Sequence, residues 1–157
     1  MKVFISHKQE DANIAKGIYG YLIEKRIEAY LDVLDEQIVN DGEALTVHLK
    51  KKLNECSDIL VVMSENTRYS QWVPFEVGMA AQTDKPTVTF LQEYVLLPEF
   101  LDFWPRLKEL SDLDYYIETR QQFESNKRGV SESYFEYSRE MDISQFYEEL
   151  KLKLGQK

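Results

Sequence analysis

Apolar residues follow two different spacings in the first 91 residues of the chain. Four short runs have the length and composition of β-strands: Val3–Ile5, part of Ile27–Leu34, Ile59–Met63 and Pro86–Leu91. Between these runs, apolar residues recur at every fourth position in two sets: Ile14, Ile18 and Leu22, then Leu45, Leu49 and Leu53. The four-residue spacing is that of one helical face. Strands that alternate with helices in this way predict an α/β domain with a mainly parallel sheet.

Further helices are predicted after the third strand. The stretch Trp72–Gln82 is almost free of polar residues, so we expect a helix that is buried on most sides. Helical spacing also covers Asp112–Phe123, and a last helix is predicted to begin at the capping pattern Asp142-x-x-Gln145. Residues 98–105 predict either a short helix or a strand. The 157 residues are expected to form a single domain.

Glu76 is the only charged residue between Trp72 and Gln82. A carboxylate inside a protein normally needs a partner. Trp72 precedes Glu76 by four residues, so a helix would place both side chains on one face. An aromatic ring beside a desolvated acid suits binding of a planar, cationic ring and chemistry at an adjacent bond. The structural alternative is a glutamate that is stabilised near a helix start by the helix dipole.

Charge and composition exclude several classes of partner. The chain has 28 acidic and 19 basic residues and a net charge of -9, which argues against nucleic acid and against an anionic membrane surface. Its single cysteine, Cys56, suits a reducing compartment. There is neither a signal peptide nor an apolar run long enough to span a bilayer, so a soluble, cytoplasmic protein is expected. With one cysteine and two histidines, no metal site is expected.

Ligands of an open parallel sheet bind beyond the carboxyl ends of its strands. Ser6 and His7 end the first predicted strand, and Ser70 lies just before the Trp72 helix, so all three are predicted to line the ligand rim. Arg68 in the same loop could meet a ligand phosphate. The alternative is that Ser6 and Ser70 hydrogen-bond to turn or cap amides and that Arg68 lies on the surface.

Four segments in the same order resemble a known family. They read V-F-I-S-H-K-Q-E-D, A-Y-L-D through D-G-E, D-I-L-V-V-M-S and S-x-W-V-x-x-E. Together they span roughly residues 2–91 and resemble the Toll/interleukin-1 receptor (TIR) domain, in particular the bacterial enzymatic type found in small TIR proteins of antiphage (Thoeris-like) systems. The resemblance implies a flavodoxin-like three-layer sandwich with a mainly parallel sheet of four to five strands. Residues 92–157, a predicted helical part, carry no motif.

The resemblance also implies a function. Enzymatic TIR domains cleave the nicotinamide–ribose bond of NAD+, and Glu76 and Trp72 match their catalytic glutamate and the tryptophan before it. NAD+ is then a substrate, no cofactor is required, and the product is ADP-ribose or a cyclic ADP-ribose-type signal. Two alternatives stay open: a non-enzymatic TIR–TIR signalling scaffold, and a nucleoside deoxyribosyltransferase-like enzyme. Both alternatives share the sheet topology of an enzymatic TIR domain, so the fold does not distinguish them from it.

Residues 35–43 correspond to a loop that, in similar domains, packs against a neighbouring domain and helps to complete the NAD+ pocket. Ile38 and Val39 form an apolar pair in this otherwise polar loop. We therefore expect self-association through TIR–TIR contacts, and a separate effector protein that responds to the product. The alternative is that the loop packs onto its own domain.

Overall fold

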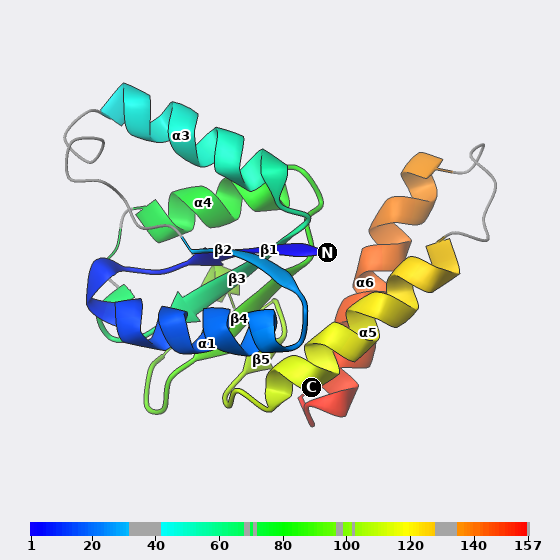
Figure 1. Cartoon of the computed structure of the whole chain (residues 1–157). Helices are drawn as coiled ribbons and strands as arrows, with labels where there is room; N and C mark the ends of the chain where they lie inside the picture. The colour runs from blue at the N-terminus through cyan, green and yellow to red at the C-terminus, as the bar shows by residue number, and fades with distance from the viewer. Residues whose placement is uncertain are drawn as a thin grey trace.

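The fold is a five-stranded sheet between layers of helices (Figure 1). The computed structural model describes residues 1–31, 42–67, 70, 72–96, 99–101, 103–127 and 135–156, with side chains of the last range from residue 143. All strand pairs are parallel, in the order β2-β1-β3-β4-β5. The strands are β1 (Lys2–Ser6), β2 (Glu28–Leu31), β3 (Asp58–Met63), β4 (Thr87–Leu91) and β5 (Arg106–Leu107). The predicted α/β, flavodoxin-like architecture is confirmed.

Helices cover both faces of the sheet. They are η1 (Gln9–Asp11), α1 (Ala12–Glu24), α3 (Gly42–Glu55), α4 (Trp72–Ala81), η3 (Glu99–Leu101), α5 (Asp112–Lys127) and α6 (Phe135–Lys153). In Figure 1, α1 lies on one side of the sheet and α3 and α4 lie on the other, while α5 and α6 pack side by side. The two predicted sets of leucine and isoleucine face inward, since all but Ile14 are buried.

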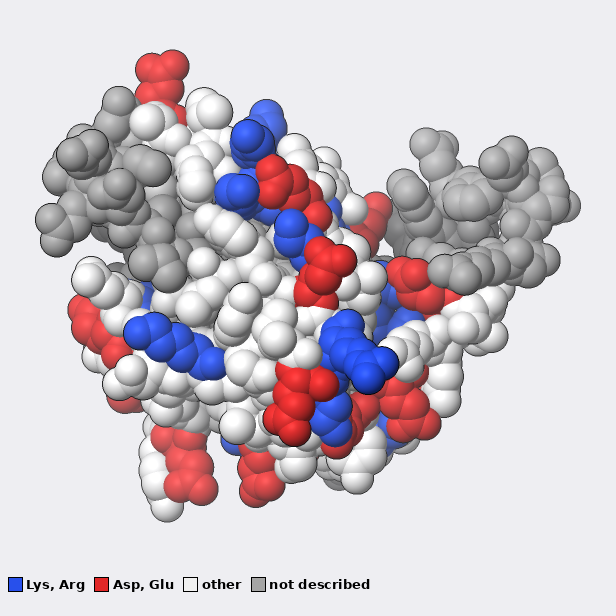
Figure 2. All heavy atoms as spheres, viewed as in Figure 1, with Lys and Arg blue, Asp and Glu red and all other residues white. Residues whose placement is uncertain are grey.

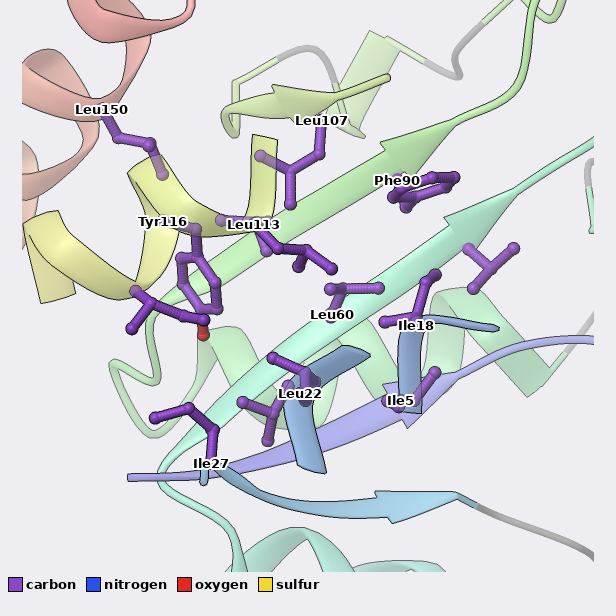
Figure 3. Close-up of a cluster of buried hydrophobic side chains, with 14 of the residues drawn as sticks. Ile5, Ile18, Leu22, Ile27, Leu60, Phe90, Leu107, Leu113, Tyr116 and Leu150 are labelled. Atoms are coloured by element: carbon purple, nitrogen blue, oxygen red, sulfur yellow. The ribbon is translucent and has the colours of Figure 1, made fainter. Parts of the chain in front are cut away.

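Residues alternate between the two cores along each strand. Val3 and Ile5 belong to the core beneath α1, α5 and α6, of which Figure 3 shows Ile5, Leu60, Tyr116 and others converging. Phe4 belongs to the second core, beneath α3 and α4. Because side chains alternate along a strand, Ser6 lies on the same face as Phe4, toward α4.

Two predicted helices differ from the structure. The Trp72 helix is buried on one face only, since Pro74, Phe75 and Gly78 are exposed on its outer side. The apolar composition of this helix therefore did not mean that it is buried on most sides, as the sequence predicted. The last helix begins at Phe135 and not at Asp142. Residues 135–141 contain neither glycine nor proline, so nothing in this stretch ends a helix, and the capping pattern falls in the interior of α6.

The fifth strand could not be predicted from the sequence. β5 has only two residues and pairs with β4 at the edge of the sheet. Its outer side is covered by Gln156, whose amide accepts from the Arg106 N–H at 3.0 Å and donates to the Arg106 carbonyl oxygen. A side chain thus takes the place of a neighbouring strand and protects the edge from pairing.

The predictions for Ile38, Val39 and Arg68 concern residues outside the part of the chain that the structure describes. Within the described part of the chain, no helix combines the length and apolar character that a membrane crossing needs.

Candidate functional site

The Glu76 carboxylate lies in the second turn of α4 and is only 5% exposed. Its Oε2 accepts a hydrogen bond from the hydroxyl of Ser6, which is fully buried at the end of β1. The contact follows from two local rules: the strand alternation directs Ser6 toward α4, and Glu76 shares the buried face of α4 with Val73 and Ala80. The Ser6 hydroxyl orients the Glu76 carboxylate. The hydrogen bond also offsets part of the free energy that burial of a charged group costs.

Trp72 is the first residue of α4 and is 37% exposed. Its indole meets the ring of Phe75 edge to face, with centroids 5.9 Å apart and ring planes at 80°. The sequence predicted a shared face for Trp72 and Glu76. The structure adds that the indole is half open to solvent where the helix begins, whereas the carboxylate one turn later is buried. An aromatic surface is therefore accessible one turn from a desolvated acid.

Ser70 and His7 have structural contacts at the same rim. The Ser70 hydroxyl accepts from the Val73 N–H at 3.3 Å, so it satisfies one of the amides that a helix start leaves without an intrahelical partner. The His7 ring is partly buried, with Nδ1 3.3 Å from the Ile5 carbonyl oxygen. Both residues lie at the predicted rim, and for Ser70 the geometry matches the capping alternative.

A second buried carboxylate, Asp11, was not predicted from the sequence. Its Oδ2 accepts from the hydroxyls of Ser64 and Thr67, each at 2.6 Å, and its Oδ1 accepts from the Asn66 side-chain amide at 3.0 Å. Ser64 Oγ in turn accepts from the backbone amides of Asn66 and Thr67. This Asp11 cluster joins the start of α1 to the loop that leaves β3 toward α4.

The Asp11 cluster keeps its carboxylate charged. Burial raises the pKa of Asp11. The hydrogen bonds from Ser64, Thr67 and Asn66 and the charge of His7 lower it by a larger amount. The pKa therefore lies below the ordinary value of 3.8. Asp11 belongs to the first family-like segment, yet in the sequence it is one of several charged residues in a polar stretch. Only the fold shows that it is 3% exposed.

The cluster and Glu76 lie where the strand order reverses. β1 and β3 are neighbours in the sheet, and their crossovers run to opposite sides, which makes their carboxyl ends the switch point of this topology. Ser6 ends β1 and Ser64 follows β3. Among the described residues, no group of histidine, cysteine, aspartate and glutamate side chains is arranged to hold a metal ion. The side chains described at this point are the carboxylates of Glu76 and Asp11, the hydroxyls of Ser6, Ser64 and Thr67, and the indole of Trp72.

Residues 3–131 match the sequence model of the TIR domain family. The chain belongs to this family. The match includes the four segments in the first 91 residues that resemble the family, and it extends beyond them through α5.

Two bacterial relatives of this TIR domain are named for a reaction. TIR2 of Cytobacillus dafuensis, named as a cyclic ADP-D-ribose synthase, is 30% identical over 89 residues, which are 53% of this chain and 23% of TIR2. ThsB' of Bacillus cereus (strain MSX-D12), named as a 3' cyclic ADP-D-ribose synthase, is 24% identical over 79 residues, 48% of this chain and 41% of that protein. The matched region thus covers less than half the length of either relative.

A solved structure shares the fold of this TIR domain. BcmB, a CMP N-glycosidase of Clostridium botulinum, superposes with a TM-score of 0.54 at 18% identity, over 73% of this chain and 98% of BcmB. At this identity the likeness concerns the fold alone.

Proposed function

We propose that this TIR domain cleaves the nicotinamide–ribose bond of NAD+ and that Glu76 is the catalytic carboxylate. The observation that carries the proposal is the buried Glu76 at the switch point of the sheet, held by the Ser6 hydroxyl. Two relatives named as cyclic ADP-ribose synthases add support. Trp72 supplies an aromatic surface beside the acid for the nicotinamide or adenine ring.

One carboxylate is sufficient for this reaction. Nicotinamide in NAD+ carries a positive charge on the nitrogen bonded to ribose, so it leaves as a neutral molecule when that bond breaks and takes the electron pair with it. No general acid has to protonate it. The ribose carbon becomes an oxocarbenium-like cation, which the Glu76 carboxylate stabilises by its charge. This differs from ordinary glycosidases, which use two carboxylates.

The product depends on the nucleophile that attacks the cation. Water gives ADP-ribose and releases a proton, whereas a hydroxyl or ring nitrogen of the same molecule closes a cyclic product. The names of both relatives favour the cyclic product. The proposal requires no cofactor or metal, because NAD+ is the substrate. A separate effector that responds to the product, and a role in antiphage defence, stay predictions from the family resemblance.

The experiment is nicotinamide release from NAD+ by the purified protein and by Glu76→Gln, which keeps the side-chain shape and removes the charge. We expect the variant to lose at least about a hundredfold in turnover, as is typical when a transition-state charge loses its partner. Glu65→Gln is the matched control, because Glu65 is an exposed acid in the loop between β3 and α4, the helix that carries Glu76. Unchanged cleavage by Glu76→Gln would refute the assignment.

Two other outcomes would select the alternatives. If concentrated protein releases no nicotinamide, the half-exposed Trp72 and Phe75 favour a binding scaffold. If NAD+ is untouched but bases exchange on deoxynucleosides, the protein is a deoxyribosyltransferase-like enzyme. Both assays use the same preparation.

A further inference from the structure

An apolar groove of about 420 Å³ lies between α3 and α4. Leu53 of α3 and Pro74, Phe75 and Met79 of α4 line it, and the Phe75 side chain is 40% exposed. Pockets that bind small molecules have volumes of about 300–1,000 Å³ and walls that are mostly apolar, with a few polar groups. The groove between α3 and α4 therefore has the size and the lining of a small-molecule site.

The charged groups that line this groove are positive. They are Lys50 of α3 and Lys85, which follows α4, and among the described residues none that lines the groove is acidic. The chain as a whole has the opposite sign, with a net charge of -9. Figure 2 shows blue side chains in the upper part of the molecule, where Figure 1 places α3, with acidic ones among them. The electrostatic complement of the groove is therefore an anionic group.

The Lys85 ammonium group is positioned before any ligand binds. It donates to the Cys56 carbonyl oxygen at 2.7 Å. An ammonium group has three N–H donors and this carbonyl accepts from one of them, so Lys85 can also donate to a ligand. A donor that is already fixed loses less side-chain entropy on binding than a mobile one. Lys85 therefore suits a carboxylate that lies at the edge of the groove.

Gly78 leaves open space in the groove. It is an exposed residue of α4, and no described atom of a neighbouring element lies within 4 Å of a Cβ atom placed there. Glycine is a poor helix former, and nothing packs so closely against Gly78 that a side chain would be excluded. The space beside Gly78 is therefore available to a ligand.

Phe75 connects the groove to the candidate functional site. Its ring lines the groove, and the same ring meets the indole of Trp72 edge to face, with centroids 5.9 Å apart. Trp72 and Glu76 lie one turn apart on α4. A molecule that packs against Phe75 therefore changes the surroundings of the indole at the site.

We propose that the groove between α3 and α4 binds a small molecule with a flat, apolar body and one carboxylate. The flat body packs against the half-exposed Phe75 ring, which offers a surface for stacking. The carboxylate lies beside Lys85 and Lys50. Binding is sensed at Trp72 through Phe75. The proposal goes beyond NAD+ cleavage and does not depend on it, since binding is measured without nucleotide.

The test is a titration of the full, 15N-labelled chain with 2-naphthoate, followed by NMR of the tryptophan indole N–H signals. The chain has two tryptophans, and Trp104→Phe assigns the signal of Trp72. We expect 2-naphthoate to shift the Trp72 signal with a Kd of about 1 mM or tighter. The matched probe is 2-naphthamide, which has the same rings and no charge. It should bind at least about fivefold more weakly.

Two variants test whether the probe lies in the groove. Gly78→Leu fills the space beside α4 and should raise the Kd at least about tenfold. Lys50→Gln removes one positive charge and should raise the Kd about threefold. Lys51→Gln is the control for net charge, because Lys51 is not among the residues that line the groove, and it should bind as wild type. Circular dichroism confirms that each variant is folded.

Several results would overturn the proposal. One is the absence of a Trp72 shift at probe concentrations about tenfold above the expected Kd. Equal binding of 2-naphthamide would remove the role of the lysines, and unchanged binding by Gly78→Leu would place the probe outside the groove. A Trp72 signal that moves with protein concentration alone, while 2-naphthoate does not bind, would show that a second copy of the chain covers the groove instead.

Discussion

The Ser6 hydroxyl donates to the Glu76 carboxylate across 70 positions of sequence. Both side chains are buried, and each comes from an element whose local pattern directs it there. Glu76 is therefore held in one orientation before any ligand binds. Preorganisation of this kind is what makes a charge effective in a transition state.

Ser6→Ala removes the hydroxyl that donates to Glu76 Oε2. We expect turnover of NAD+ to fall by about tenfold or more, with little change in KM, because a hydrogen bond to a charged group contributes about 1.5–3 kcal/mol. The measurement is steady-state nicotinamide release together with a thermal melt. A loss of activity that merely follows the loss of folded protein would contradict this role.

Ser70→Ala should affect stability and spare turnover. The Ser70 hydroxyl accepts from the Val73 N–H, and loss of such a cap costs about 1 kcal/mol. Ser70→Asp is the matched variant: it restores an acceptor at the positive end of the α4 dipole and should recover the stability. If Ser70→Ala lowered kcat with an unchanged melting temperature, Ser70 would instead contact the substrate.

Asp11→Asn should destabilise the protein by about 1–3 kcal/mol at pH 7, since the donors of Ser64, Thr67 and Asn66 lose their charged acceptor. The pKa of folded Asp11 lies below its ordinary 3.8, so the stabilisation by the wild-type carboxylate is complete above about pH 4 and is lost as pH falls through the lower folded value. Urea unfolding at several pH values should show a constant difference between wild type and Asp11→Asn from about pH 7 to pH 5. A difference that grows on acidification would contradict this sign.

Arg120→Met should cost about 3–5 kcal/mol of stability, because it leaves Asp58 buried without its cation. Arg120 Nε lies 2.7 Å from Asp58 Oδ1, and the Tyr116 hydroxyl donates to the same oxygen at 3.0 Å. The pair of Lys153 and Glu118, whose side chains are 25% and 58% exposed, is the control, and Lys153→Met should cost less than about 1 kcal/mol. Denaturant unfolding measures both, and equal losses would refute the distinction.

Local patterns were sufficient for most of the architecture. The apolar runs located β1, β2, β3 and β4, because strands covered on both faces need apolar residues at consecutive positions. The four-residue spacings identified α1 and α3, because each of these helices buries one face. The same reasoning failed for β5, whose two residues are too few to show a period. It also failed for the start of α6, where the capping pattern lies inside the helix.

The sequence by itself determined that an isolated carboxylate stands on a helix that begins at the ligand rim, because Glu76 is the only charge in an apolar run. Its partner could not be predicted in the same way. Ser6 was predicted only to lie on the rim, and Asp11 was one charge among several. Which hydroxyl meets which carboxylate depends on how β1, η1, β3 and α4 pack at the end of the sheet, since contacts between residues 53 to 70 positions apart leave no local pattern. The tertiary structure decided those pairs, and with them the preorganisation of the site.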